Sequence, residues 1–354
     1  MEQPKIEIIL EQVAIRKASD LHMQVGLPPM LRVDGALLPI SGMKALDGPT
    51  LESLIFSLLD DEQKQVLARE KEFDFSFAFG ELGRFRVNLF HEKGNLAGAF
   101  RLLINEIPTI EQLKLPPIID KLTDYPRGLV LVTGPTGSGK TTTLAAMINR
   151  INQEKAVHII TVEDPIEYTH KSKQSVIVQR EVHYDTYSFS AALRSVLRED
   201  PDVVLLGEMR DLETIANAIT VAETGHLVLA TLHTNGASQS VDRMIDVFPP
   251  HQQPQVRSQL SNTLMAIVSQ RLVPSVGGGR IPAVEIMIAT PAVRNLIREG
   301  KSSQLEAIIQ TGSEFGMQSM DKTLVNLVHR GEISYDEARN YAVDLGELDR
   351  LMRE

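Results

Sequence analysis

One stretch of the chain has the residue types and spacing of a phosphate-binding loop. It matches the P-loop pattern G-x-x-x-x-G-K-[ST] with the residues Gly134, Pro135, Thr136, Gly137, Ser138, Gly139, Lys140 and Thr141. Glycines let consecutive backbone N–H groups turn inward, where they hold phosphate oxygens together with the N-terminus of the following helix. We expect Lys140 to reach the β- and γ-phosphates and the hydroxyl of Thr141 to bind Mg²⁺. The stretch indicates a site for a nucleoside triphosphate, and we include the adjacent Thr142 in it.

The residues on either side supply the context that such a loop requires. The apolar run 129–132 precedes it and predicts a buried strand, whereas residues 142–149 favour a helix. A strand, a glycine-rich loop and a helix in this order form the P-loop motif. The alternative is a glycine-rich turn with a lysine by chance, and this context argues against it.

Two carboxylates follow later apolar runs, where a parallel sheet binds its ligands. The run 157–162 is followed by Glu163 and Asp164, and the run 203–206 is followed shortly by Glu208. Such carboxylates can orient or deprotonate an attacking water, or hold Mg²⁺. Of the two acids after the first run, position favours Glu163 as the residue that orients or deprotonates the water. Asp164 precedes a proline and can simply start a turn. Glu208 has the place of a Walker B acid, with glutamate instead of the usual aspartate, and would hold Mg²⁺ directly or through water.

Histidines lie at both ends of the next apolar run, residues 227–232. His226 precedes it and His233 follows it, and this odd spacing puts them on opposite faces of an extended strand. The spacing disfavours one shared metal site. A histidine at a strand tip can sense the γ-phosphate through a hydrogen bond, but the residues by themselves favour a structural role.

Arginines on two expected strands before the P-loop leave two interpretations open. Residues 84–89 alternate polar and apolar side chains, with Arg84 and Arg86 on one face, and the next strand, over residues 96–103, carries Arg101. Three arginines in one small sheet could clamp phosphate groups of a neighbouring site. They could equally be solvated charges.

The first hundred residues predict a mixed domain. An amphipathic helix is expected at 6–13, a hairpin at 30–40 with its turn at Asp34 and Gly35, and a second helix at 51–59. Residues 73–79 alternate phenylalanine with smaller side chains. That pattern indicates a strand with an aromatic core face rather than a ligand box.

From the P-loop onward, buried strands alternate with helices, which indicates an α/β fold with a parallel sheet. The simplest class is a RecA-like ATPase core. A proline-rich segment precedes it, and helical patterns follow residue 290. We expect an N-terminal domain at 1–105, a linker at 106–117, the ATPase core at 118–289 and a C-terminal helical bundle at 290–354.

Composition narrows the function classes. The chain has 354 residues, no cysteine and a formal net charge of -10, which disfavours a nucleic-acid motor and excludes disulfides and cysteine-based zinc sites. The N-terminus lacks the pattern of a signal peptide, and no apolar run approaches the length of a membrane span. We expect a cytoplasmic protein.

Four segments in this order resemble the signature boxes of the secretion ATPases of the type II secretion and type IV pilus superfamily. Besides the P-loop, residues 163–167 resemble the Asp box, 207–211 the Walker B box and 224–235 the His box of that family. Residues 18–29 look like the start of its PAS-like N-terminal domain. The resemblance covers nearly the whole chain.

A C-terminal segment resembles the retraction branch of the family. Residues 292–299 are similar to the motif A-I-R-N-L-I-R-E, with Val293 in place of isoleucine. Extension ATPases of the family have a longer N-terminal region and a zinc site of four cysteines, which this sequence lacks.

The resemblance implies roles that spacing left open. It implies that Glu163 polarises the attacking water, that Glu208 supports Mg²⁺, and that both histidines of the His box belong to the active-site network. It also implies that five arginines lie near nucleotide, the first three contacting its phosphates: Arg84, Arg86, Arg101, Arg194 and Arg243.

The resulting hypothesis is a homohexameric motor that hydrolyses ATP, with Mg²⁺, to retract type IV pili. The resemblance implies an inner-membrane pilus platform protein as partner, a possible paralogous retraction ATPase, and peripheral association with the inner membrane at the pilus base. The rivals are an extension or secretion ATPase of the same family and a RecA-like nucleic-acid translocase.

Overall fold

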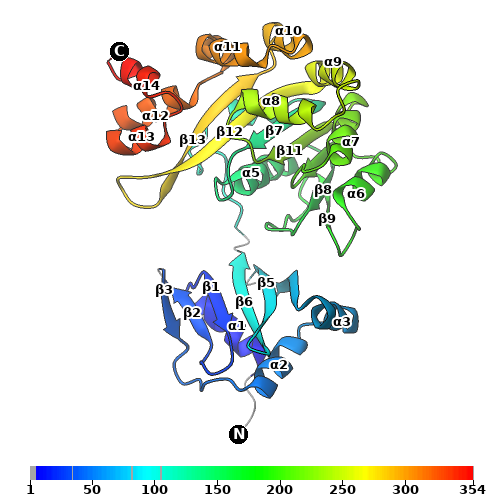
Figure 1. The fold of residues 1–354 in the computed structure, drawn as a ribbon, viewed down its shortest axis with the longest axis vertical. Helices are drawn as coiled ribbons and strands as arrows, with labels where there is room; N and C mark the ends of the chain where they lie inside the picture. The colour runs from blue at the N-terminus through cyan, green and yellow to red at the C-terminus, as the bar shows by residue number, and fades with distance from the viewer. Residues whose placement is uncertain (1–4, 34, 81–82, 104–105, 354) are drawn as a thin grey trace. The chain divides into compact units, whose positions relative to one another are not determined.

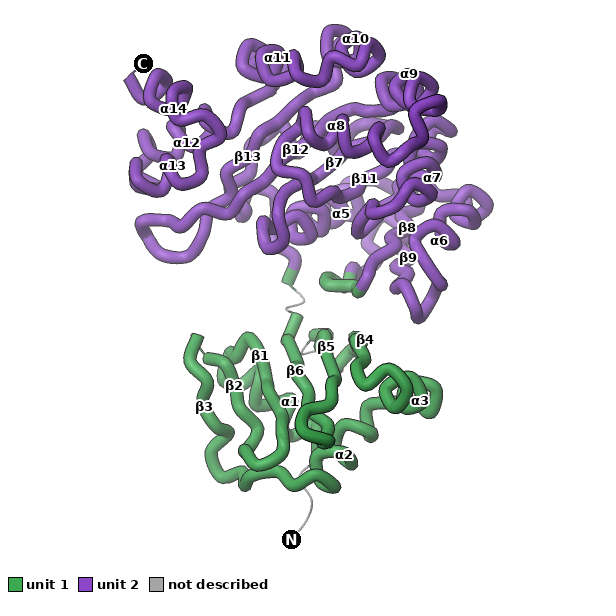
Figure 2. Tube along the Cα trace, viewed as in Figure 1, with its two compact units in different colours: residues 1–106, 165–169 green, residues 107–164, 170–354 purple. Residues whose placement is uncertain are grey.

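The computed structural model describes residues 5–33, 35–80, 83–103 and 106–353. The chain divides into two compact units, which Figure 2 shows in different colours. Unit 1 comprises Met1–Glu106 and Pro165–Thr169, and unit 2 comprises Ile107–Asp164 and His170–Glu354. The expected boundary at residue 105 lies outside the described residues, and the finer division into linker, core and C-terminal region stays a prediction.

Unit 1 is built on an antiparallel sheet. Within the described residues it has six strands in the order β3-β2-β1-β6-β5-β4 (Figure 1). The strands are β1 (Asp20–Met23), β2 (Met30–Val33), β3 (Ala36–Pro39), β4 (Glu72–Phe79), β5 (Gly83–Glu92) and β6 (Asn95–Leu103). The helices are α1 (Ile6–Ile15), α2 (Gly48–Phe56) and α3 (Asp61–Glu70).

The elements expected in this unit form, and two elements that were not expected, β1 and α3, are added to them. The hairpin β2–β3 pairs Val33 with Ala36, as a two-residue turn requires, although Asp34 of that turn lies outside the described residues. The second helix ends at Phe56. A separate helix, α3, follows because Asp60 and Gln63 form a reciprocal capping box that starts it.

One face of this sheet packs against the helices and carries the aromatic side chains. Phe85, Val87 and Leu89 of β5 are fully buried in a core that includes residues of α1 and α2. The rings of Phe75 and Phe77 stack at a centroid distance of 5.9 Å. The interpretation of the β4 phenylalanines as core packing is confirmed.

Unit 2 is built on a mixed sheet. Its seven strands, in the described part of the chain, run in the order β13-β12-β7-β11-β10-β8-β9. All neighbouring pairs are parallel except β12 and β13. The strands are β7 (Gly128–Thr133), β8 (His158–Glu163), β9 (Val176–Glu181), β10 (Val203–Leu206), β11 (Leu227–Leu232), β12 (Leu264–Pro274) and β13 (Arg280–Ile288).

Helices cover both faces of this sheet (Figure 1). On β7, Leu129 and Leu131 belong to one core cluster, and Val130 and Val132 belong to another. Alternate residues of a strand therefore face different helix layers, which explains the continuous apolar runs in the sequence. The helices are α4 (Ile118–Leu122), α5 (Lys140–Glu154), α6 (Phe189–Val196), α7 (Leu212–Glu223), α8 (Ala237–Asp246), α9 (Gln253–Thr263), α10 (Pro291–Glu299), α11 (Leu305–Thr311), α12 (Met320–His329), α13 (Tyr335–Tyr341) and α14 (Leu345–Leu351).

The helices after residue 290 divide between two clusters. Side chains of α10 and α11 are buried in the main core, together with residues of α7, α8 and α9. Side chains of α12, α13 and α14 form a smaller cluster with Val273 of β12 and Ile281 of β13. Residues 277–279 lie at the tip of the long β12–β13 hairpin.

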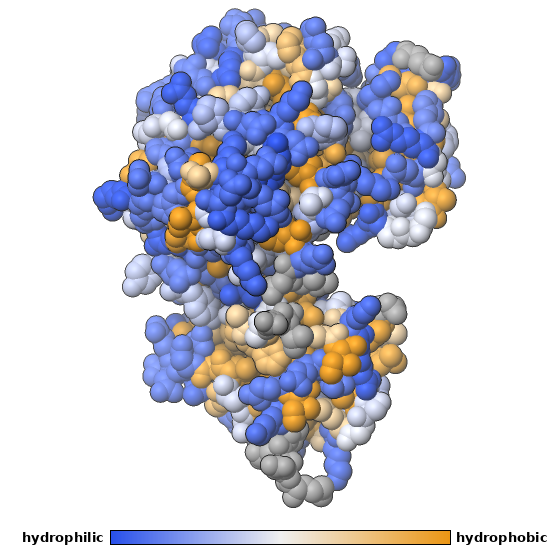
Figure 3. All heavy atoms as spheres, turned by 180° about the vertical axis from the view of Figure 1, so that it is seen from behind, coloured by the Kyte–Doolittle hydropathy of each residue, from blue (hydrophilic) through white to orange (hydrophobic). Residues whose placement is uncertain are grey.

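The surface of unit 2 is largely polar on the side that Figure 3 displays, where apolar side chains form small, separate groups. In the described part of the chain, no helix combines the length and apolarity needed to cross a membrane.

The core of unit 1 gives a direct test of the fold. Replacing the fully buried Phe85 by alanine should destabilise this unit by about 3–5 kcal/mol, because it leaves a cavity beneath the sheet. Phe90 on the same strand is 37% exposed, so Phe90→Ala should cost far less. Hydrogen exchange of the β5 and β6 amides measures the difference. Equal effects of both substitutions would contradict the packing described.

Candidate active site

The P-loop lies at the carboxyl end of β7, where the sequence places it. Gly134 has a φ of +143°, and a Cβ there would lie 2.2 Å from the backbone oxygen of Gln270 on β12. Gly139 has a φ of +88° and is the N-cap of α5. These conformations require glycine, and they turn the loop back over the start of the helix. A loop of this kind followed by a helix N-terminus suits phosphate groups.

The polar groups of the loop fit a nucleotide phosphate. The ammonium of Lys140 is buried and donates to the carbonyl oxygens of Gly134 at 2.9 Å and Pro135 at 3.0 Å. Within the described residues, the buried hydroxyl of Ser138 has no hydrogen-bond partner. A phosphate oxygen is a suitable partner for both types of donor.

Three further predicted residues gather at the same edge of the sheet. In the strand order β7-β11-β10-β8, His233 follows β11, Glu208 follows β10, and Glu163 ends β8. Adjacent strands lie about 4.8 Å apart, and parallel strands present their carboxyl ends at one edge. The structure therefore brings both acids and one of the two histidines to the side of the sheet that carries the P-loop.

A polar chain joins the P-loop to Glu208. The Nε2 of His233 lies 3.3 Å from Oε1 of Glu208, and its Nδ1 lies 3.5 Å from Oγ1 of Thr136 in the loop. A carboxylate only accepts hydrogen bonds, so Nε2 of His233 carries a proton and donates to Glu208. His233 thus connects the P-loop to Glu208 through these two contacts.

Glu208 is held in its ionised form. Burial opposes ionisation, but the hydrogen bond from Arg210 and the nearby His233 outweigh it, so the pKa of Glu208 lies below its ordinary value. The Nε of Arg210 lies 2.7 Å from Oε1 of Glu208. An anionic carboxylate together with the Thr141 hydroxyl is an oxygen donor set that suits Mg²⁺.

Glu163 is buried and fixed by two neighbours. Its Oε1 accepts from the hydroxyl of Thr161 at 2.7 Å and from the amide of Gln179 at 3.1 Å. The carbonyl of Gln179 accepts from the backbone N–H of His170 at 2.7 Å, which fixes the orientation of the amide.

The structure does not bring His226 to this edge. It precedes β11, at the amino end of the strand, where its Nδ1 lies 3.0 Å from the carbonyl oxygen of Val221 and 3.1 Å from Oγ1 of Thr224. The strand places it about 20 Å from His233. Its membership of the active-site network stays a prediction.

Arg194 and Arg243 lie on helices of unit 2. Arg194 on α6 is exposed and pairs with Glu213 at 2.9 Å. Arg243 on α8 donates to the carbonyl oxygen of Arg210 at 3.5 Å, which places it beside the Walker B segment. A role of either side chain at the nucleotide stays a prediction.

In unit 1, the three arginines share one face of the sheet, opposite the aromatic core. Arg86 lies directly across from Arg101, and Arg101 lies across from Asp20. The Nε of Arg101 donates to Asp20 at 2.8 Å, and Arg84 donates to Ser76 at 2.5 Å. The predicted cluster forms, but its contact with phosphate stays a prediction.

Sequence reasoning missed three supporting residues. Arg210 lies within the Walker B segment, and its charge close after Glu208 was an available signal. Thr161 stands two residues before Glu163, so the alternation of a strand puts both on one face. Gln179 lies on β9, which was not expected as a strand, and no local pattern connects it to Glu163.

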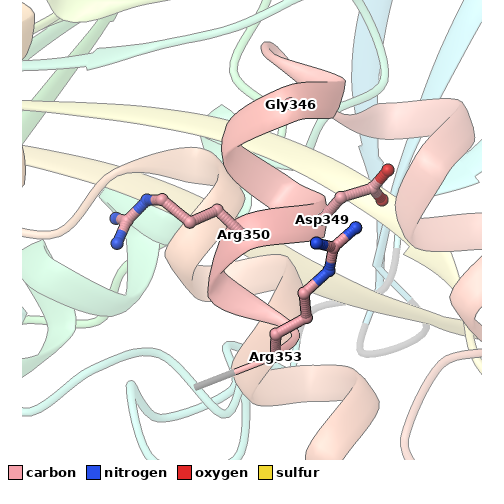
Figure 4. Close-up of a pocket in the computed structure, with 4 residues that line it drawn as sticks. All are labelled: Gly346, Asp349, Arg350 and Arg353. Carbon is pink, nitrogen blue, oxygen red and sulfur yellow. The ribbon is translucent and has the colours of Figure 1, made fainter.

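A separate pocket on unit 2 lies at α14 and is lined by Gly346, Asp349, Arg350 and Arg353. Figure 4 shows Arg350 extending to one side of the helix and Asp349 and Arg353 to the other. Arg350 pairs with Glu347 at 2.8 Å, and Asp349 accepts from the hydroxyl of Tyr335 at 2.5 Å. These side chains do not converge on one point, so the pocket is not a candidate active site.

Comparison with known proteins agrees with the geometry. Residues 102–278 match the family described as type II/IV secretion system protein. The type IV pilus retraction ATPase PilT of Pseudomonas aeruginosa is 51% identical over 92% of this chain and 94% of its own length. The chain belongs to this family of secretion ATPases. The resemblance stated from the sequence is confirmed.

Further relatives place the chain within the family. A twitching motility protein of Neisseria gonorrhoeae is 50% identical over 89% of this chain and 84% of its own length. A crystal structure of the pilus retraction motor PilT with bound ADP superposes with a TM-score of 0.93 and 46% identity, covering 98% of this chain and 99% of that one. The two-unit α/β architecture is thus that of a PilT-like ATPase.

The contact between His233 and Glu208 predicts a kinetic effect. His233→Ala should lower the ATP turnover number about 10- to 100-fold, because it removes a hydrogen bond to a charged group beside the P-loop. Steady-state ATPase assays at saturating ATP measure it. His233→Gln retains a donor and should be less impaired. Unchanged turnover in His233→Ala would show that this contact has no part in hydrolysis.

Proposed function

We propose that this chain hydrolyses ATP to power the retraction of type IV pili. The observation that carries the proposal is the P-loop with His233 and Glu208 at one edge of the sheet, joined by the contacts through Thr136. Similarity to PilT over nearly the full length of both chains supports retraction as the work that hydrolysis drives.

In the proposed reaction, the P-loop N–H groups and Lys140 stabilise the negative charge on the transferring phosphoryl group. Glu163 positions the attacking water. Hydrogen bonds from Thr161 and Gln179 hold the carboxylate of Glu163 in place for this role. Glu208 and the hydroxyl of Thr141 would hold Mg²⁺, which supplies positive charge to the phosphate oxygens when bound. His233 completes the proposed network, and Arg194 and Arg243 lie near the nucleotide.

The proposal also assigns the arginines of unit 1 and the finer architecture. Arg84, Arg86 and Arg101 contact nucleotide phosphates. Unit 1 is a PAS-like domain, and unit 2 is a RecA-like core that ends in a helical bundle. Differences in ligand contacts before and after hydrolysis would supply the stroke by moving one unit against the other.

We further propose the assembly and its surroundings. The chain works as a cytoplasmic homohexamer at the inner-membrane face of the pilus base. It acts on the pilus platform protein there, with or without a paralogous retraction ATPase. The acidic net charge of -10 disfavours nucleic acid as the track.

A gene deletion tests the direction of the motor. Cells without this gene should carry abundant pili but show no twitching, because assembly continues while disassembly stops. Electron microscopy of surface pili and a twitching assay measure both. Bald cells would identify an extension ATPase instead, and DNA-stimulated hydrolysis by the purified protein would identify a translocase.

Lys140 tests the P-loop assignment. Lys140→Ala should reduce ATP hydrolysis at least about 100-fold, because the loop loses the only side-chain charge in its motif. The same substitution should fail to restore twitching to the deletion strain. Hydrolysis at the rate of the unmodified protein would remove the basis of the proposed site.

Matched substitutions can distinguish the roles of Glu163 and Glu208. Glu163→Gln should bind ATP but hydrolyse it at least about 100-fold more slowly, because glutamine cannot accept the proton of the water. Glu208→Gln should instead make hydrolysis require more Mg²⁺. Turnover against Mg²⁺ concentration distinguishes them. Normal turnover in Glu163→Gln together with an inactive Glu208→Gln would assign the water to Glu208.

The two arginines of the retraction motif on α10 have different surroundings. Arg294 donates to the carbonyl oxygens of Ser261 at 2.7 Å and Asn262 at 2.8 Å, at the end of α9. Arg298 is exposed. Arg294 therefore stabilises the packing of α10 on α9, whereas Arg298 is available to a partner.

These positions predict different defects. Arg298→Ala should leave melting temperature and ATPase activity unchanged but impair twitching. Arg294→Ala should in addition lower the free energy of unfolding by about 1–3 kcal/mol, because the helix-end carbonyls of Ser261 and Asn262 lose a charged donor. Thermal unfolding, ATPase and twitching assays are compared for both. Normal twitching in Arg298→Ala would leave α10 with a packing role only.

A further inference from the structure

A buried glutamine supports the P-loop from behind. β12 pairs in parallel with β7, with Ser269 opposite Thr133, so Gln270 lies beside Gly134 at the start of the loop. Gln270 is 3% exposed. The loop packs closely on it, since a Cβ on Gly139 would lie 2.8 Å from the Nε2 of Gln270. The absence of a side chain at Gly139 makes room for the amide.

The side-chain amide of Gln270 bridges the loop and the helix that follows it. Its Nε2 donates to the carbonyl oxygen of Ser138 at 2.8 Å, and its Oε1 accepts from the hydroxyl of Thr143 at 2.8 Å. Both hydrogen bonds are buried. The carbonyl of Ser138 only accepts, so the orientation of the amide is determined by its partners.

This bridge controls the direction of one backbone N–H. In a trans peptide the C=O and the following N–H point in opposite directions. Because the carbonyl of Ser138 points toward Gln270, the N–H of Gly139 points away from it. That N–H belongs to the group of loop donors proposed to hold phosphate. If the Ser138–Gly139 peptide were turned over, the carbonyl oxygen of Ser138 would take the place of the Gly139 N–H on the side where phosphate is proposed to bind.

We propose that Gln270 is a positioning residue for nucleotide phosphate, acting by fixing the Ser138–Gly139 peptide and, through Thr143, the first turn of α5. The inference rests on the proposed function, because it assumes that the loop binds phosphate. The same N–H would serve bound ADP and ATP, so its orientation affects binding in the ground state and the transition state alike. Loss of the bridge should therefore raise KM and leave the turnover number nearly unchanged.

The chain offers a control for the ordinary packing role of a glutamine bridge, the half-buried Gln318. Gln318 also bridges a carbonyl and a threonine, donating to Val284 at 3.1 Å and to Thr323 at 3.0 Å. These contacts lie on β13 and α12, away from the P-loop. Gln270→Met and Gln318→Met each replace an amide bridge by a side chain of similar length.

The experiment compares both variants in the full chain. A fluorescent ADP analogue gives Kd, steady-state kinetics give KM and kcat, and thermal unfolding without nucleotide gives Tm. We expect Gln270→Met to raise Kd and KM at least about ten-fold with kcat within about three-fold, whereas Gln318→Met lowers Tm without changing Kd. An equal Kd in the two variants would overturn the proposal.

A second substitution covers the case in which Gln270→Met does not fold. Thr143→Val keeps the shape of the side chain and removes only the helix end of the bridge, and Thr143→Ser restores the hydroxyl. We expect weaker ADP binding in the valine variant and recovery in the serine variant, and equal binding in both would overturn the proposal. Lys140→Ala serves as a reference: undiminished ADP binding there would reject the loop as the nucleotide site, independently of Gln270.

Discussion

The register between four parallel strands is the constraint on which the site depends. Thr133 of β7 lies opposite Leu232 of β11, and Leu206 of β10 lies opposite Ala230. Beyond the ladders, the hydroxyl of Thr231 donates to the carbonyl oxygen of Gly207 at 2.6 Å. These pairings place His233 between the P-loop and Glu208. A slip of one residue would turn every side chain of the strand to the other helix layer.

The same register is maintained by burial on both faces. Every residue of β11 is buried, and successive residues pack against different helix layers. A strand covered in this way cannot shift without exposing one apolar set and colliding with the other layer. Side chains placed just past the strand ends are therefore held in position by the packed core. The residues in the loops after the strands can still differ in type.

The parts of this structure that follow from local patterns could be predicted from the sequence. The P-loop, the acids after the strands and the aromatic face of β4 each depend on neighbours in the chain. β12 was missed because α9 passes into it directly, with Leu264 as both C-cap and first strand residue. α3 was missed because it is mostly polar, and its start depends on a capping box rather than on apolar spacing.

The site shows a second limit of sequence reasoning, which concerns direction and distance. His226 and His233 are equivalent in sequence, at the two ends of one apolar run, yet a strand carries them to opposite edges of the sheet. The reverse holds for Thr143 and Gln270, which lie far apart in the chain and meet at 2.8 Å. Only the pairing of β12 with β7 brings them together, and that pairing depends on packing across the whole unit.

The charged face of unit 1 illustrates how an acid can support an arginine cluster. Arg86 and Arg101 lie directly opposite each other on β5 and β6, and like charges in that position repel. Asp20 relieves the repulsion by accepting from Arg101 at 2.8 Å. That contact helps to hold the pKa of Asp20 below its ordinary value, although burial acts against it. An incoming phosphate would have to compete with Asp20 for Arg101 but would relieve the same repulsion at Arg86.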